Sequence, residues 1–288
     1  MKTLSQRITC AAMALVASSA AAAEFHVALN GNDAGPGTKQ EPFATPARAM
    51  AAVRALVSSG LKTDVQVVLR GGTYALEAPL VFTTADSGTA VHAITYAAAP
   101  GETVVISGGR EITNWKAAGT SKWTAELASV RSGQWFFRQL IVNDQRAVRA
   151  RWPNEDGVLH LATVGNEVKS FTFDQALPQE SLGGQDAELV IYENWAVSRA
   201  LVSSSDQRQL ATATAVGFIG HGDDLTATPG KPAFIEHARF ALDQPHEWFL
   251  DRRTDTLTYL AASGEKPAQT VAVAPVLTQL VKIQGTKD

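Results

Sequence analysis

The carboxylates are the residues of this chain that could support general acid–base chemistry. Hydrolysis of a glycosidic bond, for example, needs two carboxyl groups about 5 Å or about 6.5–9.5 Å apart. The candidates are Glu193, Asp251 and the pair Asp223–Asp224. Asp223–Asp224 follow a turn-like Gly-His-Gly, which favours a solvated loop, and Asp251 precedes two arginines, which favours a turn-capping residue. The spacing therefore assigns no catalytic residue.

Aromatic and charged residues form a second group of candidates. Flat rings stack on sugars and guanidinium or carboxylate groups hydrogen-bond to them, so five residues are predicted to bind substrate: Arg151, Trp152, Glu193, Trp195 and Arg199. The alternative is that Trp152 and Trp195 pack between elements of the fold. Both interpretations stay open at this stage.

The sequence contains few residues that point to a metal or cofactor site. Asn30, Asn32 and Asp33 could offer oxygen ligands to calcium, but one carboxylate and no closing glutamate favour a loop-shaping role. The six histidines show no ligand spacing, and the sequence contains neither a Gly-x-Ser-x-Gly motif nor a phosphate-binding loop. We predict no metal and no cofactor.

Composition narrows the class of protein. The 288 residues are 45% hydrophobic and 18% charged, with a net charge of −3, which is typical of a globular chain. There is no basic excess for a nucleic-acid backbone, so nucleic acid is not an expected partner. The sequence does not indicate an oligomeric state.

The first 23 residues have the pattern of a secretory signal peptide. Lys2 and Arg7 precede a short apolar run, and small residues end at Ala23, the predicted cleavage site. The run is too short to span a bilayer, so no membrane span is expected. We predict a secreted or periplasmic protein.

The residues after this segment predict a β-rich domain with one helix. Thr45 is suited to cap that helix, Pro46 to begin it and Gly60 to follow its end. Strand–turn–strand segments then recur between residues 65 and 109, as in a solenoid. We predict a helical cap and first coils over 24–110.

Residues 111–270 have a different sequence pattern, in which short segments of alternating apolar and polar residues are separated by frequent turns. This pattern predicts an inserted antiparallel β-sandwich. Residues 271–288 resemble a solenoid strand again. The expected fold is therefore all-β: the N-terminal portion of a right-handed parallel β-helix with a capping α-helix, an inserted β-sandwich, and a solenoid truncated at its C-terminal end.

Several segments together resemble secreted right-handed parallel β-helix proteins of the pectate-lyase-like superfamily, and in particular glycoside hydrolase family 141 and its relatives. They are FHVALNGNDAGPGTKQEPFAT from Phe25, LRGGTY from Leu69, PGETVVISGG from Pro100, QLIVNDQRAVRARWP from Gln139, HEWFLDRRTDTLTYL from His246 and APVLTQLVKIQG from Ala274. Asp255 and Ala261 depart from the family's usual Gly and Pro at turns. The resemblance implies catalytic carboxylates in later coils, so no position here inherits a catalytic role.

These observations predict the N-terminal fragment of a secreted, polysaccharide-degrading, glycoside hydrolase-like protein that lacks its catalytic carboxylates. Its partner would be a polysaccharide or oligosaccharide. One alternative is a non-catalytic carbohydrate-binding or surface-adhesion module. Another is a gene remnant without function.

Overall fold

The computed structural model describes residues 22–178, 180, 182–217 and 228–285. The chain divides into two compact units: one comprises residues up to Ser107 together with Gln279 onward, and the other comprises Gly108–Thr278. All of the predicted signal peptide except residues 22 and 23 lies outside the described residues, as does the pair Asp223–Asp224. Within the described ranges, no helix is long and apolar enough to cross a membrane.

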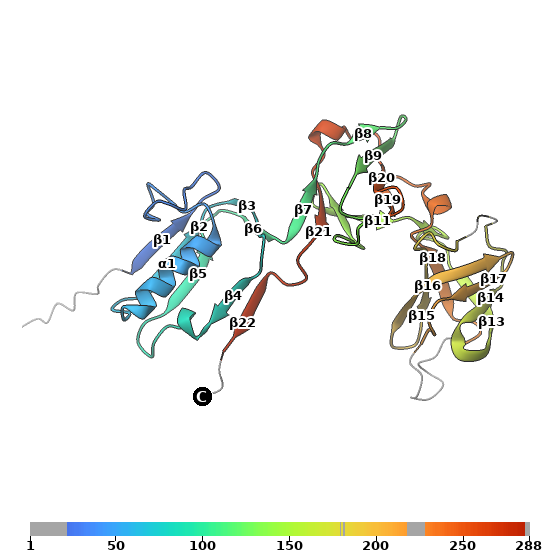
Figure 1. Cartoon of the computed structure of the whole chain (residues 1–288), viewed down its shortest axis with the longest axis horizontal. Coiled ribbons are helices and arrows are strands. Elements are labelled where there is room, and N and C mark those ends of the chain that lie inside the picture. The colour runs from blue at the N-terminus through green and yellow to red at the C-terminus, as the bar shows by residue number, and fades with distance from the viewer. Residues whose placement is uncertain (1–21, 179, 181, 218–227, 286–288) are drawn as a thin grey trace, which may run out of the picture. The chain divides into compact units, whose positions relative to one another are not determined.

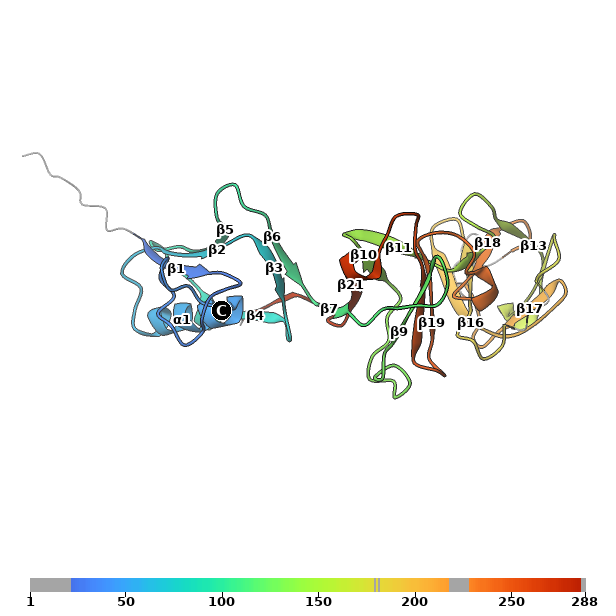
Figure 2. The ribbon, with the colours of Figure 1, turned by 90° about the horizontal axis from the view of Figure 1, so that it is seen from above.

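Helix α1 (Pro46–Ser58) begins and ends where the local sequence signals predicted. The Thr45 hydroxyl oxygen accepts a hydrogen bond from the backbone N–H of Arg48 at 3.1 Å, and Pro46 occupies the first turn, where a missing N–H costs nothing. Gly60, at φ +86°, follows the C-cap in the left-handed conformation. The apolar face of the helix, which includes Val53, is buried in the core of this unit. The helix lies beside the parallel strands (Figure 2).

The Thr45 cap should contribute measurably to stability. Thr45→Ala removes the acceptor for an N–H that has no partner inside the helix. We expect the free energy of unfolding to fall by about 1 kcal/mol in urea denaturation of the full chain. Thr120→Ala is the control, because Thr120 is exposed in a turn and lies in the other unit. Equal losses in the two variants would contradict a capping role.

The first unit contains three short parallel sheets (Figure 1). A three-stranded sheet has the order β1-β2-β5, and two pairs are formed by β3 with β6 and by β4 with β22. The strand bounds are Ala23–Val27 for β1, Val65–Leu69 for β2, Gly72–Ala75 for β3, Leu80–Thr83 for β4, Ile94–Ala98 for β5, Val104–Ser107 for β6 and Val281–Gln284 for β22. An isolated parallel bridge also joins Val27 to Phe43.

The prediction of a right-handed parallel β-helix is therefore wrong. The recurrence predicted between residues 65 and 109 would stack the strand at Leu80 on the strand at Val104, but Val104 pairs with Gly72 and Leu80 pairs with Val281. The described strands form no solenoid. Two similar strand–turn–strand segments indicate parallel neighbours, whereas a solenoid needs about three or more stacked repeats. The expectation of a truncated solenoid falls with it.

The second unit begins with an eight-stranded sheet that curls into a half-barrel, in the order β7-β21-β10-β11-β19-β20-β9-β8. Its neighbours are antiparallel except for β11 and β19, which run parallel. The strands are β7 (Gly109–Ile112), β8 (Lys116–Ala117), β9 (Lys122–Glu126), β10 (Leu140–Val142), β11 (Gln145–Arg149), β19 (Glu247–Asp251), β20 (Thr256–Leu260) and β21 (Ala272–Pro275). Its core is rich in aromatic residues, among them Trp123, Trp248 and Tyr259.

The same unit contains a closed antiparallel β-barrel (Figure 1). Its strands follow the order β18-β13-β14-β17-β16-β15, and β15 pairs with β18 to close the ring. The short β12 adds to β18. The strands are β12 (Arg151–Trp152), β13 (Leu159–Val164), β14 (Ser170–Phe173), β15 (Glu188–Tyr192), β16 (Val197–Asp206), β17 (Gln209–Thr212) and β18 (Pro232–Glu236).

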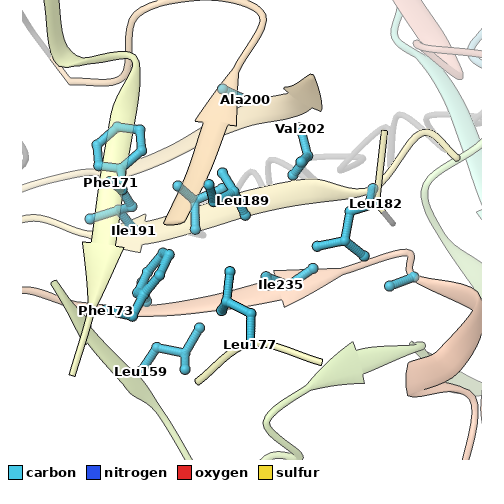
Figure 3. Close-up of a cluster of buried hydrophobic side chains, with 14 of the residues drawn as sticks. Leu159, Phe171, Phe173, Leu177, Leu182, Leu189, Ile191, Ala200, Val202 and Ile235 are labelled. Atoms are coloured by element: carbon cyan, nitrogen blue, oxygen red, sulfur yellow. The ribbon is translucent and has the colours of Figure 1, made fainter. Parts of the chain in front are cut away.

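Side chains from all around the ring fill the barrel. Phe171, Phe173, Leu189 and Ile235 are at most 2% exposed and lie in one cluster (Figure 3). Along β15, Leu189 and Ile191 belong to this cluster, whereas Glu188 and Val190 belong to the opposite, outer face of the strand. The barrel interior is therefore packed with apolar side chains.

The prediction of a β-sandwich over 111–270 is also wrong. Alternating apolar and polar residues show which face of a strand is buried, but both a sandwich and a barrel give this pattern. The deciding feature is the pairing of β15 with β18, which runs from the pair Glu188–Glu236 to the pair Ile191–Ala233. It joins two strands that would otherwise be edges, and so closes the barrel.

Candidate functional site

Two adjacent clefts in the second unit share Val148 and Glu155. We call the first the arginine cleft: it measures about 430 Å³ and is lined by Arg138, Arg146, Arg149, Arg151 and Arg199, together with Glu155, Phe234 and Glu236 among others. The second measures about 390 Å³ and is lined by acidic and amide side chains, among them Asp156 and Glu247. Both volumes fall in the usual range for small-ligand sites.

The barrel strands place charged residues in register on their outer face. Glu236 on β18 pairs with Glu188 on β15 and with Arg151 on β12. Two residues away from Glu236 on β18, Phe234 pairs with Val190 on β15. Val190 pairs in turn with Arg199 on β16. Because directly opposed side chains project to the same face, Arg151, Glu236 and Glu188 form a charged row beside the row that contains Phe234 and Arg199.

Arginines from the half-barrel complete this charged row. Arg149, at the end of β11, donates through Nη1 to Glu188 Oε2 at 2.5 Å and to Glu236 Oε1 at 2.8 Å. Arg138 donates to the other Glu188 oxygen, and Arg199 donates to Glu236. Glu188 is 1% exposed and Arg149 7% exposed, so the ion pair between these two residues is largely removed from water. Guanidinium groups thus lie between the carboxylates of Glu188 and Glu236, which are directly opposed on the neighbouring strands β15 and β18.

Arg149 also has unused hydrogen-bonding capacity. Its Nε and Nη2 atoms are buried and have no hydrogen-bond partner among the described residues. A buried donor without an acceptor carries an unrecovered desolvation cost. Since Arg149 lines the arginine cleft, a ligand oxygen is one acceptor that could meet it.

Arg151 is held in place by its neighbours. Its guanidinium lies 3.9 Å from the centroid of the Phe234 ring, and its Nε and Nη2 donate to the carbonyls of Pro153 and Gly157 at 3.1 and 3.3 Å. These contacts fix the plane of the guanidinium at low cost in side-chain entropy. The structure thus places Arg151 and Arg199, two of the predicted substrate-binding residues, in one cleft.

Trp152 does not line the arginine cleft. Its ring packs edge-on against Phe240, with ring centroids 6.2 Å apart, and it contacts the barrel core. The backbone alternation of β12 explains the difference, because neighbouring residues of a strand point to opposite faces. For Trp152 the structure favours the packing alternative.

Glu193 and Trp195 lie in the turn between β15 and β16. The Glu193 N–H donates to the Ala196 carbonyl at 2.9 Å, and a Glu193 carboxylate oxygen accepts a hydrogen bond from the Ser198 hydroxyl. Trp195 is 83% exposed, and Tyr192, at the end of β15, is 39% exposed. The hairpin therefore presents aromatic surface to solvent, at the end of the strands that carry Arg199 and Glu188.

Asp251 is committed to local structure. It accepts hydrogen bonds from the Arg253 backbone N–H at 3.0 Å and from Arg253 Nε at 3.2 Å, and it pairs with Arg239. Burial by itself would raise the pKa of Asp251, but these hydrogen bonds and positive charges together lower it. This is the turn-capping role that the sequence favoured.

Glu247 was missed at the sequence level. Burial raises the pKa of its carboxyl group, and it lines the second cleft near other acidic residues, a pattern that general acids share. However, its Oε2 accepts the backbone N–H groups of Asp243 and Gln244 at 2.8 and 2.9 Å. We therefore infer that Glu247 stabilises the turn at residues 243–246, which leads into β19.

The loop at Asn30–Asp33 serves to start helix α1. Asp33 Oδ1 accepts the backbone N–H groups of Ala44 and Thr45 at 2.7 and 2.9 Å, and Oδ2 accepts the Thr45 hydroxyl at 2.7 Å. Its carboxylate oxygens are thus occupied by the protein. Among the described residues, no group of three or more potential ligands could hold a metal ion.

Several charged residues that line the arginine cleft were not predicted as site residues, among them Arg138, Arg146 and Glu236. Glu188, which pairs with two of the arginines, was not predicted either. The available signal was the alternation Arg149–Ala150–Arg151, in which the middle residue is buried. This alternation spans the end of β11 and the start of β12. It does not identify the partners of Arg149, which are 39 residues away for Glu188 and 87 residues away for Glu236.

Comparison with known proteins gives one informative likeness. No protein-family model matches the chain, and no curated protein matches it. A solved structure described as "Glycoside hydrolase" aligns over 92% of this chain with a TM-score of 0.77 and 25% sequence identity. The chain resembles part of a glycoside hydrolase. It spans 48% of that structure, about half of its length.

A second solved structure, described as "The complex structure of XylC with xylose", aligns with a TM-score of 0.34 and 16% identity. That alignment covers 91% of this chain and 34% of the other.

Proposed function

We propose that this chain binds polysaccharide or oligosaccharide as part of an exported, glycoside hydrolase-like protein. The arginine cleft and the exposed β15–β16 hairpin would be the contact surface. The observation that carries the proposal is the cleft itself, a polar cavity of about 430 Å³ on a packed barrel, in a chain that aligns over 92% of its length with a glycoside hydrolase. Preformed cavities with fixed polar groups are typical of small-ligand sites.

The arrangement of carboxylates supports binding in this cleft more than bond cleavage. A glycosidase needs carboxyl groups that reach the glycosidic oxygen and the anomeric carbon. Glu188 is 1% exposed, and both of its oxygens accept from arginines. Glu236 is likewise paired with Arg149 and Arg199. These glutamates therefore serve to position the arginines.

The exposed hairpin aromatic offers a direct test. We expect Trp195→Ala to weaken binding of a recognised polysaccharide about tenfold, because an exposed indole loses its stacking surface without disturbing a core. Affinity electrophoresis of the full chain in gels that contain xylan, glucan, mannan or pectin would measure the retardation.

Val91→Ala is the matched control, since Val91 is 79% exposed and lies in the other unit. If no polysaccharide retards the wild-type chain, the proposed function is wrong. If a polysaccharide retards the chain and Trp195→Ala behaves as Val91→Ala does, the hairpin has no part in the contact.

A further inference from the structure

We propose that the arginine cleft binds the anionic group of an acidic sugar: the carboxylate of a uronic acid or a sulfate ester. This inference rests on the proposed function and adds the charge of the ligand to it. It starts from the balance of charge in the cleft, where five arginines face Glu155 and Glu236. Positive charge remains in excess even when the buried Glu188 is included.

Two of the five arginines have no carboxylate partner. Arg138, Arg149 and Arg199 form the ion pairs with Glu188 and Glu236. Arg146 and Arg151 form no ion pair within the described part of the chain, and Arg146 is exposed. Arg146 therefore faces solvent in the cleft, and none of the described residues accepts a hydrogen bond from its side chain, so an anion would find a counter-charge there.

Arg149 gives a second, independent observation. It is 7% exposed, and its Nε and Nη2 atoms lack hydrogen-bond acceptors among the described residues. The carboxylates that pair with Arg149 contact Nη1 alone. The two nitrogen atoms lack acceptor oxygens, which carboxylate and sulfate groups supply. A hydrogen bond to a charged oxygen is stronger than one to a neutral hydroxyl.

The cleft is also organised before a ligand arrives. Stacking on Phe234 and hydrogen bonds to two backbone carbonyls hold the Arg151 guanidinium. A planar guanidinium matches the two oxygens of a carboxylate, and little side-chain entropy is lost when it is already fixed. Neutral sugars would leave the excess positive charge without a partner. The whole chain carries a net charge of −3, so nucleic acid is not the polyanion indicated.

The test compares ligands whose main difference is the charged group. Isothermal titration calorimetry of the full chain at neutral pH would use polygalacturonate and alginate, each as the ionised carboxylate and as the neutral methyl ester, and carrageenan before and after desulfation. We expect at least one charged form to bind about tenfold or more tightly than its neutral counterpart. Binding of the ionised uronates would identify a carboxylate site, and binding of the sulfated glycan alone would identify a sulfate site.

Two variants test whether the preference for a charged ligand arises in the arginine cleft. Arg146→Gln should weaken binding of the charged ligand about tenfold, since it removes one charge-assisted hydrogen bond. Arg208→Gln is the matched control, because Arg208 is exposed in the turn between β16 and β17 and does not line the cleft; it should change the affinity less than twofold.

Equal affinity for charged and neutral forms would overturn the inference and leave the proposed function intact. The inference would also fail if the two arginine variants lost affinity equally, because that would indicate general attraction of a polyanion. Binding to no glycan at all, charged or neutral, would overturn both proposals together.

Discussion

Glu188→Ala should lower the free energy of unfolding by about 3 kcal/mol. Glu188 is 1% exposed and accepts hydrogen bonds from Arg138 and Arg149. Removing it leaves the buried Arg149 with a single carboxylate, Glu236, and two nitrogen atoms already without acceptors. A buried charge that loses its partner is expensive, because neither water nor protein compensates it. Urea denaturation at neutral pH would measure the loss.

Glu126→Gln is the control for Glu188→Ala. Glu126 also forms an ion pair, with Lys116, but the two side chains are 73% and 67% exposed. Water solvates both charges whether or not they pair, so we expect no measurable change. If Glu188→Ala were as mild as Glu126→Gln, the ion pairs of the arginine cleft would contribute nothing to folding.

A double variant separates a lost interaction from a lost side chain. Arg149→Met removes the buried charge that Glu188 compensates, so Glu188→Leu should cost much less in that background than in the wild type. The two residues are within hydrogen-bonding distance, at 2.5 Å, and neighbours of this kind are expected to couple. Additive losses would show that the two side chains stabilise the barrel independently.

Helix α1 was predictable because its signals are local. Thr45, Pro46 and Gly60 each act within one turn of the helix end that they define, and the structure places each in the expected role. The same holds for strands such as β2 and β10, which span the mainly apolar segments between Asp64 and Arg70 and between Gln139 and Asn143. Local patterns fix elements because the relevant contacts lie within a few residues.

The arrangement of the strands was not predictable by the same means. Barrel closure depends on β15 pairing with β18, whose residues Glu188 and Glu236 are far apart in the chain. The parallel partner of β4 is β22, so Leu80 pairs with Val281. Two sequence segments that look alike therefore suggested a repeat where the chain instead folds into separate short parallel sheets.

The site shows the same division. Arg151 and Arg199 were chosen for the type of their side chains, and the structure brings them into one cleft. Trp152 was chosen on the same basis, yet it packs against Phe240, because its position on β12 turns it away from Arg151. Residue type indicates what a side chain could bind, whereas register decides what it faces.

His237 predicts how stability responds to acid. Its imidazole is 1% exposed; Nδ1 lies 3.1 Å from the Asp186 carbonyl oxygen, and Nε2 accepts the Leu250 N–H at 3.2 Å. This arrangement requires a neutral ring with its proton on Nδ1. Burial, with a smaller contribution from the positive charge of Arg149, lowers the pKa of His237 to about 4, although Asp186 and Glu188 act in the opposite direction.

A histidine with a lowered pKa in the folded state stabilises the protein least in acid. The unfolded chain takes up a proton near the ordinary value of about 6.5, whereas the folded chain does so near pH 4. Its contribution is therefore fully present above about pH 6.5 and declines as the pH falls to about 4, by about 3 kcal/mol in total. Urea denaturation of the wild type and His237→Gln at pH 7 and pH 4.5 would measure the difference.

The comparison between variants isolates His237 from the carboxylates that also titrate in acid. His160→Gln is the control, because His160 is half-exposed beside Asp174, and its dependence on pH should differ from that of the wild type far less than that of His237→Gln does. His237→Gln should show a flatter dependence, since its amide carries no proton to gain. Nuclear magnetic resonance of the imidazole gives a reading that requires no variant: a His237 ring that protonated at pH 6 in the folded protein would contradict the buried, neutral tautomer from which the prediction follows.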